Sequence, residues 1–227
     1  MSQPDMTTES AGRLRLMRWL IRALALAVAL LFVGLLAYGI TAQNPSTTID
    51  DNLARGQSTP APPFRLAILQ PGSLGPLLKP KLGATLARRW LNLSELRGTP
   101  IVLNIWASWC VPCQQEAATL ERVWRRQARP HGVLFVGLDM QDVITDARTF
   151  MRHYGIDYLN IRDPSNDVPR SYGATGVPET FFITAQGRII GHIPGESSMQ
   201  QLTAGIAAAR SGRVQGTLQG GAQRSFH

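Results

Sequence analysis

The chain has 227 residues, of which 44% are hydrophobic and 17% charged, so it can form a full hydrophobic core without disulfide staples. Its net charge of +8 suits an anionic membrane surface, an acidic partner or nucleic acid, but no DNA- or RNA-binding motif is present. The two cysteines, Cys110 and Cys113, are too few for a secreted disulfide framework, and the four dispersed histidines supply no second ligand pair for a zinc site.

An apolar segment near the N-terminus predicts a transmembrane anchor. Residues 23–40, ALALAVALLFVGLLAYGI, carry no charge and span roughly 27 Å as a helix, close to the thickness of the bilayer core. The absence of a polar face at helical spacing argues against a buried core helix. A cleaved signal peptide is the alternative, but the stretch is long and Ile40-Thr41-Ala42 is a poor cleavage site.

Basic residues before this segment predict its orientation. Arg13, Arg15, Arg18 and Arg22 lie within residues 1–22, and positive charge is retained on the cytoplasmic side. We therefore expect residues 1–22 to lie in the cytoplasm and everything after residue 42 to lie on the extracytoplasmic (periplasmic) side. The cysteine pair would then lie in an oxidising compartment.

The next stretches are less regular. Residues 41–63 are rich in Thr, Ser, Gln, Asn and Pro, which predicts a linker between the membrane and a folded domain over residues 64–210. Within that domain, the glycines and prolines of residues 64–93 indicate turns around one or two short strands. The tail, residues 211–227, is rich in Gly and Gln and is expected to be flexible.

From residue 101 onward, hydrophobic periodicity predicts alternating strands and helices. The expected strands are 101–106, 133–138, 158–161, 180–183 and 188–192, the last two joined as a hairpin through Ala185-Gln186-Gly187. The expected helices are 113–129, 145–154 and 199–210. This order predicts an α/β fold with a mixed central sheet flanked by helices. An arginine cluster at 122, 125, 126 and 129 is interpreted as a solvated helix face, with a docking patch as the alternative.

The segment Trp109-Cys110-Val111-Pro112-Cys113 lies between a predicted buried strand and a predicted helix. A thiolate at a helix N-terminus is stabilised by unpaired N–H groups and by the helix dipole. Cys110 is therefore expected to attack disulfides, and Cys113, one turn later, to resolve the mixed disulfide. A structural disulfide or half of a zinc knuckle is the alternative interpretation.

Two motifs carry a resemblance to a known family. Residues 106–113, Trp-Ala-Ser-Trp-Cys-Val-Pro-Cys, and residues 176–180, Gly-Val-Pro-Glu-Thr, resemble the two signature elements of thioredoxin-fold proteins. With Leu96-Arg97-Gly98-Thr99-Pro100, they resemble the membrane-anchored TlpA/ResA and DsbE/CcmG branch over roughly residues 60–210, and the second motif favours DsbE/CcmG. This resemblance implies a thioredoxin-like fold and an extracytoplasmic thiol–disulfide reductase of cytochrome c maturation.

The resemblance also implies roles for individual residues. The Val177–Pro178 peptide bond would be cis, so that a client segment can pair beside Cys110; an ordinary strand-entry turn is the alternative. We expect Trp109, Val177, Pro178 and Glu179 to contact the client. Glu179 could instead be a solvated loop residue.

Glu116 lies one helical turn after Cys113, where a desolvated carboxyl can exchange protons with the resolving thiol. The alternative interpretation is that Glu116 is a surface residue in the first turn of a helix. Asn104 replaces the buried aspartate that cytoplasmic thioredoxins carry six residues before the first cysteine, and it matches the membrane-anchored branch. The proton role is therefore expected to fall to Glu116 rather than to residue 104.

The expected cycle needs no organic cofactor and no metal, because the two sulfurs carry the electrons. The partners implied by the resemblance are a disulfide-containing client, such as apocytochrome c or the protein that presents it, and a transmembrane thiol donor of the DsbD/CcdA kind. A disulfide oxidase or isomerase is a further reading of the same site. A copper(I) chaperone, using His153 or His192 as a distal ligand, is a reading from another class.

Overall fold

The structure is a computed structural model that describes residues 7–42 and 47–225. The chain divides into two compact units, one ending at Asn44 and the other beginning at Pro45. The first unit contains helix α1 (Thr7–Ala42), which includes the predicted span at residues 23–40. Its segment Met17–Tyr38 is long and apolar enough to cross a membrane, and no part of it is buried against protein. The predicted helix is therefore confirmed, with an apolar portion that starts six residues earlier.

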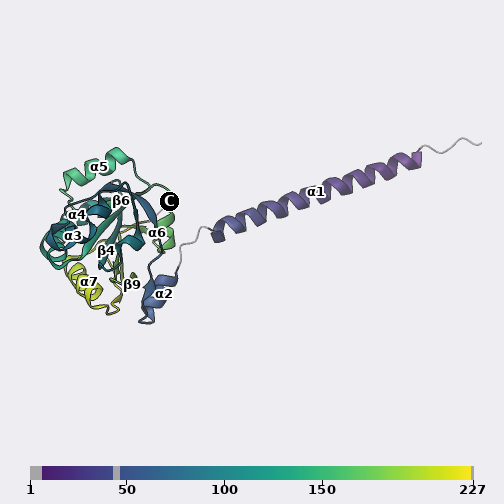
Figure 1. Cartoon of the computed structure of the whole chain (residues 1–227). Coiled ribbons are helices and arrows are strands. Elements are labelled where there is room, and N and C mark those ends of the chain that lie inside the picture. The colour runs from purple at the N-terminus through teal and green to yellow at the C-terminus, as the bar shows by residue number, and fades with distance from the viewer. Residues whose placement is uncertain (1–6, 43–46, 226–227) are drawn as a thin grey trace, which may run out of the picture. The chain divides into compact units, whose positions relative to one another are not determined.

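The second unit is built on a mixed sheet (Figure 1). Within the described residues its strand order is β1-β9-β8-β4-β5-β6-β2-β3, and β10 pairs with the free part of β9. Strands β4, β5 and β6 are parallel, whereas β8, β9, β2 and β3 join antiparallel to their neighbours. The bounds are β1 Thr59–Pro60, β2 Arg65–Gln70, β3 Trp90–Asn92, β4 Ile101–Trp106, β5 Leu134–Met140, β6 Leu159–Asp163, β7 Gly176–Val177, β8 Glu179–Ile183, β9 Arg188–Pro194, β10 Gly216–Thr217 and β11 Arg224–Ser225.

Helices flank the sheet, as the sequence predicts. Helix α4 (Val111–Val123) packs against α7 (Met199–Ser211), and α7 in turn lies on β4, β8 and β9. Helix α4 continues through a π-helical turn, η2 (Trp124–Ala128), and a 3-10 turn, η3 (Arg129–His131), where Pro130 and Gly132 end the predicted helix. The remaining helical elements are α2 (Thr48–Ala54), α3 (Gly75–Leu86), η1 (Leu93–Leu96), α5 (Ile144–His153) and α6 (Asp167–Ser171).

The region 64–93 differs from the prediction, because it contains a helix between its two strands. Glycines and prolines in this stretch suggested turns, yet Pro76 lies in the first helical turn, where a missing N–H has no cost. Leu78, Leu82 and Leu86 recur every four residues and are buried, so one apolar face holds α3 on the domain despite the internal Pro80.

Two segments expected to be loose also belong to the folded unit. In the predicted linker 41–63, Ile49 and Leu53 of α2 are buried in the core and β1 pairs with β9. In the predicted flexible tail 211–227, β10 pairs with β9 and β11 pairs with β7. Short polar segments of this kind are fixed by backbone pairing with distant strands, which local composition does not report.

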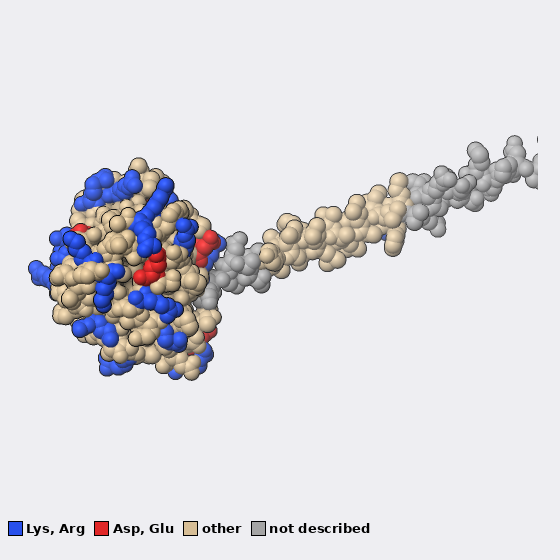
Figure 2. All heavy atoms as spheres, in the orientation of Figure 1, with Lys and Arg blue, Asp and Glu red and all other residues tan. Residues whose placement is uncertain are grey.

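Lys and Arg residues are spread over the face of the domain shown in Figure 2, with few acidic residues among them. The arginine cluster near the end of α4 is partly paired. Arg125 hydrogen-bonds Glu121 and lies 3.7 Å from Asp157, while Arg129 lies 3.8 Å from the same carboxylate. Exposed pairs of this kind contribute little to stability, typically about 0–1 kcal/mol.

Candidate active site around Cys110 and Cys113

The two cysteines lie at the start of α4, directly after the loop that follows β4. They form a disulfide, and their Cα atoms are 5.2 Å apart. Cys110 is the N-cap residue, and its Sγ accepts a hydrogen bond from the backbone N–H of Cys113 at 3.1 Å. Pro112 occupies the first helical turn. The sequence predicted this placement, but both cysteines are buried, whereas we expected Cys110 at an exposed end.

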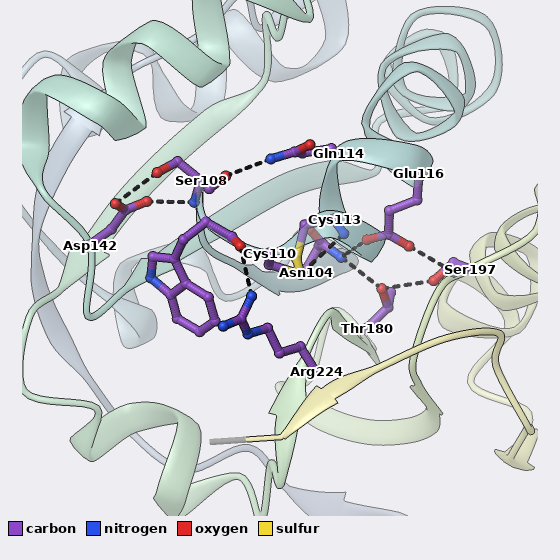
Figure 3. The surroundings of a disulfide bond; sticks show 11 residues. Asn104, Ser108, Cys110, Cys113, Gln114, Glu116, Asp142, Thr180, Ser197 and Arg224 are labelled. Carbon is purple, nitrogen blue, oxygen red and sulfur yellow. Dashed lines mark hydrogen bonds between the residues drawn. A yellow bond between two sulfur atoms is a disulfide. The ribbon is translucent and has the colours of Figure 1, made fainter. Parts of the chain in front are cut away.

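A carboxylate from the neighbouring strand end anchors the loop before Cys110 (Figure 3). Asp142 accepts hydrogen bonds from the backbone N–H of Ser108 at 2.5 Å and from its hydroxyl at 2.8 Å. Gln114 of α4 donates to the Ser108 carbonyl at 3.0 Å, and the Trp109 indole N–H donates to the Gln141 carbonyl at 3.2 Å. The loop is therefore fixed both to α4 and to the segment after β5.

Glu116 is buried within a polar network on the Cys113 side of the loop (Figure 3). Its Oε1 accepts from the Asn104 amide at 2.8 Å, and its Oε2 accepts from the Ser197 N–H at 2.7 Å. The Asn104 amide also donates to the Thr180 hydroxyl, which bonds the Ser197 hydroxyl at 3.0 Å. Burial, only partly offset by these neutral donors, raises the pKa of Glu116 to about 8.

The Val177–Pro178 peptide bond is cis, as the resemblance implies. The next residue, Glu179, begins β8 and pairs with Ile105 near the carboxyl end of β4, from which the cysteine loop emerges. Its Oε1 accepts from the backbone N–H groups of Thr175 at 2.8 Å and Gly176 at 3.1 Å. Glu179 is thus a buried residue that holds the segment before Pro178, not a solvated loop residue.

The other oxygen of Glu179 faces a buried histidine. His192 Nε2 lies 2.9 Å from Glu179 Oε2, and its Nδ1 lies 2.8 Å from Asp50 Oδ1 of α2. Because both ring nitrogens meet carboxyl oxygens, these surroundings favour the doubly protonated, charged form of the ring. Burial alone would lower the pKa of His192, but the hydrogen bonds and charges of Asp50 and Glu179 outweigh it and raise that pKa.

A second unusual carboxyl lies at the end of β5. Asp139 pairs in register with Trp106, is fully buried, and lies 3.5 Å from the Arg162 guanidinium. Burial and the nearby charge of Asp142 raise the pKa of Asp139 to about 8. The acid therefore lies beside the carboxylate that anchors Ser108.

The C-terminal segment also reaches the site. Arg224 donates from Nη1 to the Trp109 carbonyl at 3.4 Å, and its guanidinium lies 5.2 Å from the centre of the Trp109 ring (Figure 3). Gln223 donates to Glu179 Oε1 at 2.6 Å. Two residues expected to contact a client, Trp109 and Glu179, are therefore already in contact with this chain's own tail.

The two histidines considered as copper ligands, His153 and His192, contact other side chains. Both nitrogens of His192 are engaged by carboxylates, and His153 packs edge-on against Tyr154 of α5. Among the residues that the structure describes, no group of three His, Cys, Asp or Glu is arranged to hold a metal ion.

Comparison of the sequence with family models identifies the family to which this chain belongs. The model of the AhpC/TSA family matches residues 60–192, which is more than half of the chain and includes both motifs. The chain belongs to the AhpC/TSA family. Its thioredoxin-like domain is built on the mixed sheet described above, so the predicted fold class is confirmed.

Curated relatives of this AhpC/TSA-family protein are thiol–disulfide proteins. It is 38% identical over 100 residues to the thiol:disulfide interchange protein DsbE of Allochromatium vinosum, a match covering 44% of this chain and 53% of that protein. It is 26% identical over 112 residues to the thiol-disulfide oxidoreductase ResA of Bacillus thuringiensis subsp. konkukian, covering 49% and 64%. The chain therefore spans between about half and two thirds of these relatives, and the resemblance to the DsbE and ResA types is confirmed.

Solved structures show the same fold. A secreted Mycobacterium tuberculosis disulfide oxidoreductase homologous to E. coli DsbE superimposes with a TM-score of 0.51 at 23% identity, covering 64% of this chain and 95% of that one. A DsbF homologue from Corynebacterium diphtheriae gives 0.51 at 22% identity, covering 67% and 88%. At these identities the comparison establishes the fold alone.

Sequence reasoning placed the motif residues but missed their partners. Asp139 lies near the carboxyl end of the buried parallel strand β5, and Asp142 follows that strand. Side chains at the carboxyl ends of adjacent parallel strands meet at one edge of the sheet, so these positions were a usable signal. The contact between Glu116 and Ser197 gave no such signal, because the two residues are 81 positions apart in the chain, and neither did the contact between His192 and Asp50, which are 142 positions apart.

Proposed function

We propose that this protein is a thiol–disulfide oxidoreductase that reduces disulfides in client proteins through Cys110 and Cys113. The observation that carries the proposal is the disulfide at the N-terminus of α4, with the Cys113 N–H directed at Cys110 Sγ. Once the disulfide is reduced, that N–H and the helix dipole stabilise a thiolate on Cys110. The names of the DsbE and ResA relatives support the same chemistry.

The proposed exchange has two steps, both balanced in sulfur and electrons. The Cys110 thiolate attacks a client disulfide, forming a mixed disulfide and releasing one client sulfur as thiolate. Cys113 loses its proton and attacks Cys110 Sγ, which forms the Cys110–Cys113 disulfide and releases the second client sulfur. The client gains two electrons and the protein loses two, so a dithiol donor protein must reduce the pair again.

Glu116 is the proposed proton-exchange partner of Cys113, and its carboxylate form, the minor form at neutral pH, accepts the thiol proton. It follows Cys113 by one helical turn, is buried, and has a pKa of about 8, which is close to that of an ordinary thiol. A carboxyl and a thiol of similar pKa exchange a proton with little free-energy cost. Glu116→Gln should therefore slow exchange about 10²-fold at pH 7, and an unchanged rate would remove Glu116 from the reaction.

The resemblance to the DsbE/CcmG and TlpA/ResA branch supports a finer proposal about partners and place. The client would be apocytochrome c or the protein that presents it, and the donor a transmembrane thiol carrier of the DsbD/CcdA kind. Arginines before the apolar part of α1 favour a domain on the extracytoplasmic side of the membrane. A reporter that is active only outside the cytoplasm, fused after residue 227, tests this orientation.

The function is tested by trapping. Cys113→Ser should accumulate mixed disulfides on Cys110 that dithiothreitol releases, and mass spectrometry should find a Cys-x-x-Cys-His segment in the trapped client. Cys110→Ser is the matched control and should trap nothing. Equal trapping by both variants, or none by either, would contradict the proposal.

Direction is tested by the equilibrium potential of the pair against glutathione. A reductase is expected below roughly −200 mV, whereas a value near about −120 mV would identify an oxidase. Copper(I) that stays bound through purification would instead favour the chaperone reading.

A further inference from the structure

The C-terminal segment, residues 213–225, is attached along an exposed edge of the domain. After α7 it follows β9 in the parallel direction, with Gly216 opposite Gly191 and Thr217 opposite His192. Backbone N–H groups of this segment donate to β9 carbonyls, namely Gln215 to Ile190 at 2.7 Å, Leu218 to His192 at 2.8 Å and Gly220 to Pro194 at 3.1 Å. The segment is therefore guided toward the end of β9 that lies beside Glu179.

Beyond β9, the segment turns onto the residues just before Pro178. Gly221 donates to the Glu196 carbonyl at 2.8 Å, and Glu196 donates back to Ala222 at 3.0 Å. Strand β11 then pairs antiparallel with β7, with Arg224 opposite Val177 and Ser225 opposite Gly176. The backbone edge on which a client strand was expected to pair is thus occupied.

Side chains of the same segment contact residues on β8 and in the cysteine loop. Gln223 reaches Glu179, and Arg224 lies over the Trp109 ring and bonds the Trp109 carbonyl, one residue before Cys110. Cys110 itself has no exposed surface in this arrangement. A client disulfide therefore cannot reach the attacking sulfur without a rearrangement of the surrounding chain, and the bound segment occupies the neighbouring backbone edge.

We propose that residues 213–225 compete with the client for the binding site beside Cys110. We propose further that the client segment makes the same kinds of contact with this site as residues 213–225 do. This inference rests on the proposed function and deepens it. The occupant is an extended strand with a basic residue over Trp109 and an amide donor to Glu179. It also passes close to the backbone, since a Cβ added to Gly176 would lie 2.5 Å from the Arg224 carbonyl oxygen.

Gly220 offers a way to release the segment in the full-length chain without altering the cysteines. A Cβ at this position would lie 2.3 Å from the Pro194 carbonyl oxygen, so Gly220→Val is incompatible with the bound segment. Gln219→Val is the matched control, because the Gln219 side chain is exposed on the same segment. Arg224→Gln is a second, milder variant that leaves the backbone free to pair.

The readout is the alkylation rate of Cys110 by iodoacetamide in the reduced, detergent-solubilised protein, assigned by mass spectrometry. If the segment covers the site for about 90% of the time, its release should raise this rate about tenfold in Gly220→Val, and roughly threefold in Arg224→Gln. Gln219→Val should match the wild type. Rates within twofold of the wild type in both test variants would overturn the proposal.

A synthetic peptide of residues 213–225 tests the client chemistry. Added to Gly220→Val, it should restore slow alkylation, and the same peptide with Arg224→Glu should not. Protection by both peptides, or by neither, would contradict the assigned role of the basic residue. Because alkylation needs no catalysis, fast alkylation without any disulfide exchange would refute the proposed function alone, whereas normal exchange with unchanged alkylation would refute only the competitor.

Discussion

Glu116 lies in α4 and Glu179 at the start of β8, and each has only 1% of its surface exposed. Their partners differ in charge. Glu116 accepts hydrogen bonds from the neutral Asn104 amide and the Ser197 N–H, whereas Glu179 faces the ring of His192, whose pKa is raised. Burial among neutral donors raises the pKa of Glu116 to about 8, so this acid carries a proton at neutral pH.

We propose that this difference separates a carboxyl that takes part in the exchange from one that fixes the structure. A buried acid with neutral partners can give up and regain a proton at modest cost, which suits the step in which Cys113 loses its proton. A buried acid with a cationic partner and two backbone N–H donors instead fixes the position of the chain, here the segment of Thr175 and Gly176. The same residue type thus serves two purposes because its neighbours differ.

The largest expected effect is on the pH dependence of stability. The folded pKa of Glu116 is about 8 and its reference value is 4.5, so the unfolded chain releases this proton first as the pH rises. The free energy of unfolding should therefore fall by about 1.4 kcal/mol per pH unit between roughly pH 5 and 8 on account of Glu116. Urea titrations of wild type and Glu116→Gln should differ by this slope; equal slopes would show that Glu116 is not protonated in the fold.

Two other groups also lower the free energy of unfolding as the pH rises, and their effects should persist in Glu116→Gln. The raised pKa of His192 gives stability that is present below pH 6.5 and is lost as the pH rises through the folded value. The raised pKa of Asp139, about 8, also removes stability as the pH rises from its reference value of 3.8. Asp139→Asn is the matched control, since it should remove its own share of the slope and leave that of Glu116.

A smaller effect separates the two glutamates at constant pH. Glu179→Gln should lower the free energy of unfolding by about 3 kcal/mol at pH 7, because the amide loses the charge that pairs with buried His192. Glu116→Gln should instead raise it by about 3 kcal/mol at pH 7, because the amide stays neutral in the fold without the cost of keeping a proton well above the reference pKa of 4.5. Similar losses in both variants, measured by urea unfolding, would mean that the two sites do not differ as described.

The smallest expected effect is at the outer partner of His192. Asp50 is partly exposed, with 44% of its side chain accessible, so Asp50→Asn should cost only about 0.5–1 kcal/mol. Asp51→Asn controls for the charge in the first turn of α2 and should change stability by less than about 0.5 kcal/mol. A loss at position 50 no larger than that at position 51 would remove Asp50 from the His192 site.

The strands and helices with strong local signals could be predicted from the sequence. Strand β4 has the predicted bounds 101–106, because a continuous β-branched and apolar run is typical of a buried strand. Helix α3 was missed because its prolines and glycines resemble turn signals, although three leucines bury one face. Local patterns identify an element reliably only where composition and burial agree.

The site was only half predictable for a related reason. Motifs placed Cys110, Cys113, Glu116 and Glu179, but the surroundings of Glu116 include Ser197, 81 residues away, and those of His192 include Asp50, 142 residues away. The tail was missed altogether, because its strands are held by backbone pairing with β9 and β7 and not by hydrophobic periodicity. Such pairing becomes visible only once the sheet is formed.

The most direct test of the account is a single turnover with one equivalent of a peptide carrying an oxidised Cys-x-x-Cys-His segment. Reduced full-length protein should convert it to the dithiol and finish with the Cys110–Cys113 disulfide, while Cys110→Ser leaves the peptide oxidised. Reduction that persists in Cys110→Ser, or no reduction by the wild type although Cys110 is alkylated freely, would contradict the account.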